Sequence, residues 1–306
     1  MTNYNFSICK LCHQGGNRIA YRLKMANVIV CKHCGFHYTD YLDDEYLPQS
    51  AHAEQITHID EKTIKYIEQK LQSNPQRFHH HTQIVKQYIQ QGENILDVGF
   101  GGAIFLRNML AANMQAYGIE LDRQYILYAT EKLHLKNVYS FPIQDAFWQT
   151  NYAEFFNAIV LWDVLEHVNF PNELLHNAVN LLQPNGYIFI DTPCRNSFYH
   201  ITGEWMSKLS FGYYNGFLHS MYSNHRFGHK QIFSKKDIQF LFHQSDIELI
   251  FLQQFHEISF PYEFYLHKII QNKWLLKIAV PATKLFFMVF KVKNKMMLIG
   301  KKKSKK

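Results

Sequence analysis

The sequence lacks any uninterrupted apolar run of the length that a membrane-spanning helix needs, about 18 residues or more. It also lacks an apolar run close to its first residue, because Met1 to Lys10 is mixed in character. The first absence argues against a transmembrane helix and the second against a secretory signal. We therefore expect a cytoplasmic protein, whose 306 residues suffice for one large domain with appendages.

Acidic residues are missing from the last part of the chain. From Phe264 to Lys306 there are twelve lysines and no Asp or Glu, so the remaining 20 Lys and Arg stand against all 25 acidic residues. The formal net charge of +7 thus averages a mildly acidic body, of net charge −5, with a basic tail. Nucleic-acid binding through a uniformly basic face is not expected. The tail, Lys301 to Lys306, would add attraction to anionic lipid.

Cysteine is scarce, and its placement is informative. Of the five cysteines, Cys194 stands alone, and the others form two CxxC pairs: Cys9, Cys12, Cys31 and Cys34. Without a secretory signal such pairs favour metal over disulfides, and four thiolates complete a closed tetrahedral zinc site. We expect residues 1–45 to form a structural zinc ribbon, with a hairpin between the pairs at residues 18–23 and 27–30.

Glycine is also sparse, at 14 residues, yet three glycines gather behind one predicted strand. Asn94 to Val98 has the composition of a buried β-strand, and Ala103 to Ala112 has helical spacing of apolar residues. Gly99, Gly101 and Gly102 stand between them, where a side chain would hold a ligand away from the backbone. Strand, glycine turn and helix form the first half of a nucleotide-cradling βαβ unit.

Predicted strands and helices alternate after this turn. The strands are expected at residues 114–121, 137–141, 157–162, 187–191, 246–255 and 295–300, with helices between them. Pro184-Asn185-Gly186 is expected to be a turn, and Ser234 to begin a helix with a capping box. This alternation predicts a Rossmann-like, doubly wound α/β sheet of seven strands, with an antiparallel last strand.

Two carboxylates follow strands at positions suited to a nucleoside. Glu120 ends the second strand about twenty residues past the glycine turn, where a carboxylate accepts hydrogen bonds from a ribose diol. Asp145 follows the third strand and is placed to meet an adenine amino group. The alternatives are a solvated surface acid for Glu120 and an ordinary loop acid for Asp145.

Taken together, the motifs resemble those of class I S-adenosylmethionine-dependent methyltransferases. The resemblance is carried by Leu96-Asp97-Val98-Gly99-Phe100-Gly101-Gly102-Ala103, Gly118-Ile119-Glu120, Trp162-Asp163-Val164-Leu165-Glu166-His167 and Leu181-Leu182-Gln183-Pro184-Asn185-Gly186. The Leu-Glu-His and Pro-Asn-Gly elements resemble the branch that includes quinone-biosynthesis and small-molecule enzymes. The four-cysteine module is similar to that of bacterial methyltransferases of sugar and surface-polysaccharide pathways. The resemblance covers about residues 5–255 and departs from the family pattern at Phe100 and at Ala103, where a third glycine is usual.

This resemblance implies S-adenosylmethionine as the cofactor, together with a set of contact residues. The set is Asp97, Gly99, Phe100, Gly101, Gly102, Glu120, Leu121, Asp145, Ala146, Trp162 and Asp163. A nicotinamide dehydrogenase is the rival for a glycine-rich βαβ unit. Here, however, the spacing is Gly-x-Gly-x-Ala, and no second nucleotide-binding half follows.

Residues 196–232 are rich in aromatic residues and histidine and depart from helical periodicity. They follow the fifth strand at the edge where α/β sheets bind ligands, so we expect the acceptor pocket and a lid there. His229 resembles a family histidine and is the first candidate for a general base, with His225 second and Tyr222 as a hydrogen-bonding partner. A packing role is the alternative for His229, and His167 is expected to be structural or near the cofactor.

The segment before the sheet, residues 46–92, is expected to be a helical linker or cap, with helices at residues 51–71 and 76–90. The run His79-His80-His81 cannot chelate one ion, because consecutive residues point to different sides of a helix. The sheet domain itself is expected to take residues 93–260 and 294–306.

The last insertion, residues 261–293, is basic and amphipathic, is broken by Pro281, and is too interrupted to span a bilayer. Such a segment lies in a membrane interface, or packs on the domain as a pair of helices. The protein would then be peripheral at the inner membrane face.

The expected activity is methyl transfer from S-adenosylmethionine to a small molecule: a sugar, a glycan or a lipid-linked precursor. Such a reaction needs alignment of the reacting atoms, and a base only where the acceptor must lose a proton. Two alternatives stay open. One is an RNA methyltransferase that grips RNA with the ribbon, although residues 1–50 are not rich in Lys and Arg. The other is a non-catalytic adaptor with the cofactor fold.

Overall fold

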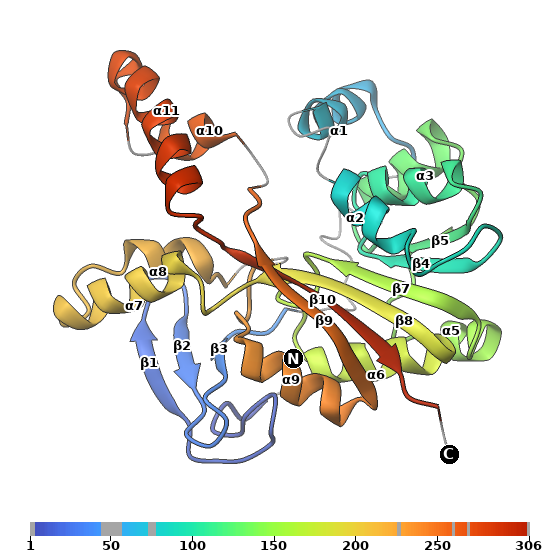
Figure 1. Cartoon of the computed structure of the whole chain (residues 1–306), viewed down its shortest axis with the longest axis horizontal. Coiled ribbons are helices and arrows are strands. Elements are labelled where there is room, and N and C mark those ends of the chain that lie inside the picture. Colours follow the sequence, from blue (N-terminus) through green and yellow to red (C-terminus); the bar gives the residue numbers. More distant parts are fainter. Residues whose placement is uncertain are drawn as a thin grey trace.

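The computed structural model describes residues 4–43, 57–72, 78–224, 228–258, 261–267 and 270–304. Its centre is a seven-stranded sheet covered by helices, and a three-stranded sheet lies beside it (Figure 1). Near the C-terminal end of the chain, α10 (Tyr262–His267) and α11 (Lys273–Val289) project away from this body.

The central sheet has the strand order β6-β5-β4-β7-β8-β10-β9. Its strands are β4 (Asn94–Val98), β5 (Gln115–Ile119), β6 (Val138–Tyr139), β7 (Phe156–Trp162), β8 (Leu182–Pro193), β9 (Ile247–Phe255) and β10 (Lys295–Lys302). The five neighbouring strands β6, β5, β4, β7 and β8 pair in parallel, whereas β10 is antiparallel to both β8 and β9. The predicted doubly wound sheet with an antiparallel last strand is confirmed.

One strand begins well before its predicted start, whereas the others begin within one residue of theirs. Strand β8 begins at Leu182 rather than at residue 187, because Leu182 already pairs with Phe156 of β7. The register then shifts, and Asn185 adopts a φ of 65°. The predicted Pro-Asn-Gly turn is therefore an irregularity within a strand whose pairing continues on both sides of it.

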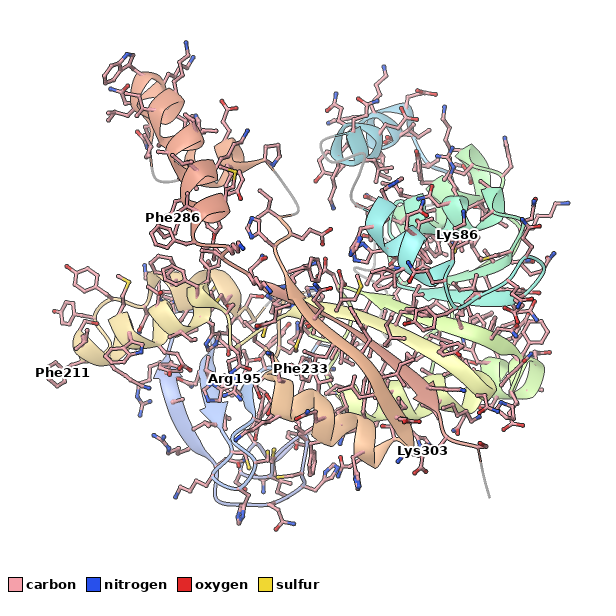
Figure 2. The ribbon with its side chains drawn as sticks, viewed as in Figure 1. Lys86, Arg195, Phe211, Phe233, Phe286 and Lys303 are labelled. Carbon is pink, nitrogen blue, oxygen red and sulfur yellow. The ribbon has the colours of Figure 1, made fainter. Side chains whose placement is uncertain are left out.

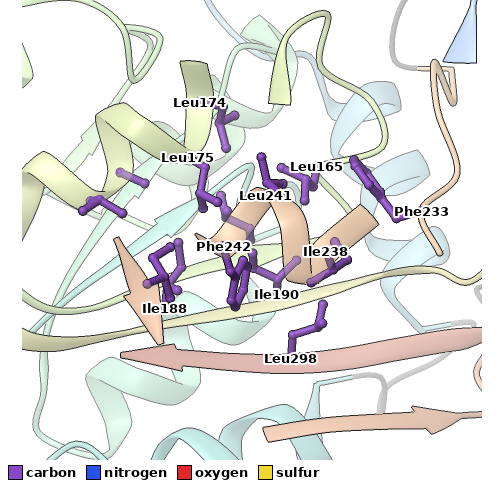
Figure 3. Packing of buried hydrophobic residues seen from close by; sticks show 14 of the residues in the cluster. Leu165, Leu174, Leu175, Ile188, Ile190, Phe233, Ile238, Leu241, Phe242 and Leu298 are labelled. Atoms are coloured by element: carbon purple, nitrogen blue, oxygen red, sulfur yellow. The ribbon is translucent and has the colours of Figure 1, made fainter. Parts of the chain in front are cut away.

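Successive side chains of a strand point to opposite faces of the sheet, so the sheet has an apolar core on each face. The helices around them are α1 (Glu61–Gln72), α2 (His79–Val85), α3 (Ile104–Ala111), α4 (Arg123–Leu127) with the π-helical turn η1 (Tyr128–Lys132), α5 (Ala146–Tyr152), α6 (Pro171–Leu181) and α9 (Lys235–Gln244). Ile188 and Ile190 of β8 pack in one core with α6 and α9, as Figure 3 shows for Phe242. Phe189 lies in the other core, with Phe105 of α3.

The N-terminal ribbon has three antiparallel strands, β1 (Arg18–Arg22), β2 (Asn27–Val30) and β3 (His37–Thr39). The first two are the predicted hairpin, and the third joins the ribbon to the main domain. The N–H of Thr39 donates to the carbonyl of Lys230 over 2.7 Å. The ring of Phe36 lies 5.5 Å from that of Phe233, centroid to centroid. The ribbon therefore shares a core with the sheet domain.

Four thiols converge within the ribbon. The Sγ of Cys9 lies 3.7 Å from that of Cys34, and the Sγ of Cys12 lies 3.6 Å from that of Cys31. None of the four is in a disulfide. A tetrahedron with Zn–S bonds of about 2.3 Å would put its sulfurs about 3.8 Å apart. The cysteines are thus arranged to hold a metal ion, and the donor set and spacing fit structural zinc.

Residues 196–232 are more helical than the sequence predicts, since they contain α7 (Phe198–Leu209) and α8 (Gly216–Met221). The buried side chains of α7 are small or polar: His200, Gly203 and Ser207. Its exposed side chains include Trp205 (62 %) and Leu209 (73 %). An ordinary surface helix buries apolar residues and exposes polar ones, so α7 has the reverse pattern. Its buried residues still recur at helical spacing, so the expected departure from helical periodicity is wrong here.

The insertion before β10 forms α10 and α11, and Pro281 lies inside α11 without ending it. The predicted break at this proline is wrong. Proline cannot donate an N–H to the carbonyl of Lys277, yet the helix continues on both sides. Among the described ranges of the chain, no helix combines the length and apolar character needed to cross a bilayer.

Removal of one thiolate is expected to release the zinc and to destabilise the whole domain, because the ribbon shares its core. Cys12→Ser should remove the zinc ion of the four cysteines, so that the metal content falls by about one ion per chain. The thermal unfolding midpoint should fall with it. Cys194→Ser is the control, since Cys194 lies outside the thiol cluster. Mass spectrometry of metal content and calorimetry would test this, and a variant that keeps its zinc would contradict it.

Candidate functional site

The glycine turn lies where β4 ends, beside the end of β5. The N–H groups of Gly99 and Phe100 both donate to the carbonyl of Ile119, over 2.7 and 3.2 Å. Gly99 has a φ of 76°, and a Cβ there would come within 2.8 Å of Val164, so glycine is required. A Cβ on Gly101 would meet nothing within 4 Å. The turn therefore leaves open space above Gly101.

Glu120 is held against this turn by three backbone donors. One carboxylate oxygen accepts from the N–H of Gly101 over 2.8 Å. The other accepts from the N–H groups of Leu121 and Asp122, over 2.8 and 2.9 Å. Burial raises the pKa of Glu120, while these donors act to lower it. Glu120 thus braces the turn, and its remaining lone pairs are available to a ligand with hydroxyl groups.

Asp97 lies beside Glu120 and is 2 % exposed. One of its carboxylate oxygens has no hydrogen-bond partner among the described residues. Burial, followed by the charge of Glu120, raises the pKa of Asp97 well above its usual range. Because an unpaired buried carboxylate is costly, this pair of acids suits a cationic ligand that brings hydrogen-bond donors, as S-adenosylmethionine does.

Two residues predicted to contact the cofactor pack into the protein instead of standing free. A Cβ on Gly102 would overlap Leu71 of α1, so this helix covers the turn at that point. The ring of Phe100 turns into the core between α3 and β5, where it lies against Gly118. The large side chain of Phe100 therefore shapes the inner side of the turn.

Asp145 caps α5, because its carboxylate accepts from the N–H of Phe147 over 2.8 Å. Ala146 beside it is exposed, and Leu121 is half-buried. The loop-acid alternative and the adenine contact are both compatible with this position, since a carboxylate has further lone pairs.

Trp162 and Asp163 end β7 in a crowded setting. The Nε1 of Trp162 is buried without a hydrogen-bond partner in the described part of the chain. Its ring lies 4.5 Å from that of His81, centroid to centroid. Asp163 adopts a φ of 54°, and its N–H donates to the carboxylate of Asp191 over 2.6 Å.

A buried group of charges at this edge was missed by the sequence analysis. The ammonium of Lys295 lies 2.6 Å from a carboxylate oxygen of Asp163, 3.3 Å from Asp191 and 3.0 Å from Glu257. The Nε2 of His81 lies 3.0 Å from Asp191. The only signal in the sequence is the polar residue Lys295 at the start of an apolar strand.

His81, Asp191 and Glu257 have the ligand types of a metal site, and their ligand atoms lie close together. The Lys295 ammonium, however, already supplies the positive charge between these carboxylates. An ion there would meet a fixed cation, so no metal is required. Of the three consecutive histidines, His79 and His80 are exposed, and His81 is buried beside Asp191.

His229, the first candidate for a base, lies in the same region. Its Nδ1 donates to the carbonyl of Met221 over 2.8 Å, which leaves Nε2 as the acceptor in the neutral ring. Burial lowers the pKa of His229, although the charge of Asp163 opposes this. Its ring lies 4.7 Å from that of His167, whose pKa burial lowers to about 3. Both rings are therefore neutral near pH 7.

Of the three predicted catalytic residues, the structure describes His229 and Tyr222. Tyr222 is 2 % exposed, and its hydroxyl hydrogen-bonds over 2.9 Å to the Nε2 of His200, not to His229. His225 lies outside the described residues. The predicted role of Tyr222 beside His229 stays a prediction.

Replacement of the unpaired acid should stabilise the ligand-free protein. At neutral pH, Asp97→Asn is expected to raise the thermal midpoint, because the amide avoids burying a charge. The folded-state pKa of Asp97 is raised, so the penalty is absent below the unfolded-state pKa of about 3.9 and grows as the pH rises from there towards the folded-state pKa. The difference between variant and wild type should therefore vanish in acid. Calorimetry against pH measures it, with Glu173→Gln on the surface of α6 as control. A lower midpoint for Asp97→Asn at neutral pH would contradict this account.

Known proteins with related sequences are methyltransferases. A family model described as a methyltransferase domain matches residues 64–251. The ubiquinone biosynthesis O-methyltransferase of Bordetella avium is 31 % identical over 112 residues, which cover 35 % of this chain and 45 % of that protein. The protein of the same name from Glaesserella parasuis is 32 % identical over 107 residues, covering 33 % and 45 %. The chain thus spans about half the length of these curated relatives.

Solved structures agree in fold. A SAM dependent methyltransferase from Archaeoglobus fulgidus superposes with a TM-score of 0.51 at 16 % identity, covering 78 % of this chain and 99 % of that one. A SAM-dependent methyltransferase from Methanosarcina mazei gives 0.51 at 12 % identity, covering 72 % and 98 %. With the family model matching more than half of its residues, this chain belongs to the family of methyltransferase domains.

Proposed function

We propose that this protein binds S-adenosylmethionine at the glycine turn and transfers its methyl group to a small-molecule acceptor. The observation that carries the proposal is the pair of acids, the buried Asp97 and the partly buried Glu120, beside the open space above Gly101. Membership of the methyltransferase-domain family supports it. The O-methyltransferase names of the relatives favour an acceptor oxygen.

The chain's part in the reaction is positioning and, for a hydroxyl acceptor, proton removal. When bound, S-adenosylmethionine supplies an electrophilic methyl group on a sulfonium whose leaving group departs neutral, so no acid is needed. Glu120 and Asp97 hold the cofactor, and alignment of the acceptor by the surrounding side chains contributes several kcal/mol, up to about 7–11 in the best cases. His229 accepts the acceptor's proton at Nε2, since its Nδ1–H is committed to Met221.

Cofactor binding is tested by calorimetric titration with S-adenosylmethionine. Glu120→Ala should weaken the affinity more than tenfold, because it removes the ribose acceptor and loosens the turn. Asp97→Asn should weaken it as well, while Glu173→Gln should leave it unchanged. Absence of binding by the wild-type protein at millimolar S-adenosylmethionine would contradict the proposed enzyme and favour the non-catalytic adaptor.

The base assignment predicts a pH profile. With a hydroxyl acceptor, turnover should fall as His229 becomes protonated, and this acid limb should lie below pH 6.5 because burial lowers the pKa of His229. His229→Ala should lose about 10²-fold or more in kcat and the limb with it. Radiolabelled methyl transfer to a panel of phenols and isoprenoid-linked sugars measures both. Full turnover with normal cofactor affinity in His229→Ala would dismiss the base, and His176→Ala is the surface control.

The acceptor class we propose is a lipid-linked precursor, with the protein lying on a membrane surface. The support is a group of exposed apolar side chains on α7 and α11. Rings of the two segments pack together, with centroids 6.1 Å apart for Phe198 and Phe286. Leu276 is the buried residue of α11, while Trp274 (68 %) and Met288 (69 %) are exposed. Figure 2 shows Phe286 on α11 and Phe211 beyond α7 on the same side of the molecule.

Charge points to the same surface. Helix α11 carries lysine and no acidic residue, and Phe211 is 99 % exposed. Exposed aromatic residues with lysines among them suit the interface of a bilayer that contains anionic lipid. A substrate anchored in that bilayer would then be presented beside α7, which follows the end of β8.

Vesicle sedimentation tests this surface. The protein should bind vesicles of three parts zwitterionic and one part anionic phospholipid, and bind less as salt rises. The double variant Trp205→Ala, Trp274→Ala should bind several-fold more weakly. Tyr66→Ala is a matched control, since Tyr66 on α1 is 62 % exposed, as Trp205 is. Equal binding by the double variant, or no binding by the wild type, would refute the membrane contact.

A further inference from the structure

A cleft of about 620 Å³ lies between the ribbon and α7, away from the glycine turn. Figure 1 shows β1 and β2 of the ribbon beneath α7 and α8. The basic, acidic and histidine side chains among its lining are Arg18, Arg22, His37, Arg195, Glu204 and Lys208. Part of its lining comes from residues 196–232, where the sequence predicts the acceptor pocket and a lid, but the proposed reaction at the glycine turn does not use this cleft.

Three metal-ligand side chains meet at the wall of this cleft. His37 comes from β3, and His200 and Glu204 come from successive turns of α7. His37 is 7 % exposed and His200 is 1 % exposed, while the side chain of Glu204 is 21 % exposed. The ligand atoms of all three lie within 4.8 Å of one another. The cluster is thus buried on its histidine side and reaches the cleft through Glu204.

The distances in the cluster do not fit hydrogen bonds. The Nδ1 of His37 lies 3.7 Å, and that of His200 3.6 Å, from the same carboxylate oxygen of Glu204. Charge-assisted hydrogen bonds are about 2.7–2.9 Å long. Four ligands at about 2.0–2.1 Å from a zinc ion would lie about 3.4 Å from one another. The observed spacing is close to the ligand spacing of a metal site.

Both histidine nitrogens are also without other partners. Among the described residues, neither the Nδ1 of His37 nor that of His200 has a hydrogen-bond partner, and both atoms are buried. Buried polar atoms are normally paired, because an unpaired one costs about 1–3 kcal/mol. Two unpaired ring nitrogens that face one carboxylate oxygen therefore point to a ligand between them.

An outer partner orients one of the three ligands. The other ring nitrogen of His200, Nε2, lies 2.9 Å from the hydroxyl of Tyr222. Metal-binding histidines and carboxylates typically have such outer hydrogen bonds, which fix the ring and the carboxylate in place.

We propose that His37, His200 and Glu204 form a second metal site, separate from the four cysteines, which binds a divalent transition ion such as zinc. Two imidazoles and one carboxylate are a usual set for a zinc site with an open position. The open position would face the cleft. This site goes beyond the proposed methyl transfer and does not depend on it.

The charge around the cleft defines what fills the open position. Arg18, Arg22 and Lys208 line it, and Arg195 is paired with Asp237 at 3.1 Å. A divalent ion held by one carboxylate would add to this positive charge, so the remaining ligand should be an anion. A phosphate or carboxylate group of a small molecule, held by the ion and by the basic side chains, has the matching chemistry.

The other histidine-containing clusters are weaker candidates. His81, Asp191 and Glu257 already surround the ammonium of Lys295. Glu166, His167 and His229 belong to the region already assigned to the acceptor. A substitution in one of these clusters, His81→Ala, nevertheless provides a comparison for the experiment.

The test is the metal content of the zinc-loaded full chain after equilibrium dialysis against micromolar zinc. Wild type should hold two ions per chain, whereas His200→Ala and Glu204→Gln should each hold one. The retained ion shows that the ribbon, and hence the domain, is folded. His176→Ala, on the surface of α6, should keep two. One ion in the wild type, or a second ion that persists in both variants, would overturn the proposal, as would its loss in His81→Ala alone.

Two further readouts address ligand type and anion. Cobalt added to protein that holds zinc only at the four cysteines should give weak ligand-field absorption without thiolate charge-transfer bands, and His37→Ala should abolish it; thiolate bands would overturn the assignment. Inorganic phosphate should tighten the second ion several-fold in the wild type and less in Lys208→Gln. Unchanged affinity in phosphate would overturn the anionic ligand. None of these measurements needs S-adenosylmethionine, so their outcome is independent of whether the protein transfers a methyl group.

Discussion

The buried ammonium of Lys295 is the contact on which the site edge of the sheet depends. It joins the start of β10 to Asp163 after β7, to Asp191 in β8 and to Glu257 after β9. Without it, several carboxylates would be buried close together, and removing one partner of such a buried pair costs about 3–5 kcal/mol. The last strand in the sequence therefore supplies the positive charge that neutralises the carboxylates of the earlier strands and of the loops that follow them.

A second constraint is that the ribbon and the sheet domain have no separate cores. Phe36 packs on Phe233, and β3 pairs with the segment before α9. This contact places His37 beside α7. It also explains the reversed character of α7, whose polar residues face the ribbon and whose apolar residues face outward. The four-cysteine site, the ribbon and α7 are thus connected by direct packing, although α7 is far from the ribbon in the sequence.

Much of the cofactor side could be predicted from the sequence because its signals are local. Glycines at positive φ, a carboxylate after a strand, and the Ser234 capping box on α9 depend on a few neighbouring residues. The prediction was weaker where burial and not periodicity decided the structure. α7 was misjudged because its inward face is polar, and Pro281 because exposed helices tolerate one missing hydrogen bond.

The sequence by itself determined the order of strands and helices, the paired cysteines and the glycine turn, since each is a short pattern with a direct physical cause. Only the tertiary structure decided which distant side chains meet. Lys295 reaches Asp163 across more than 130 residues, and His37 reaches His200 across more than 160. Such meetings follow from strand order and from the docking of the ribbon, which no local pattern of residues encodes.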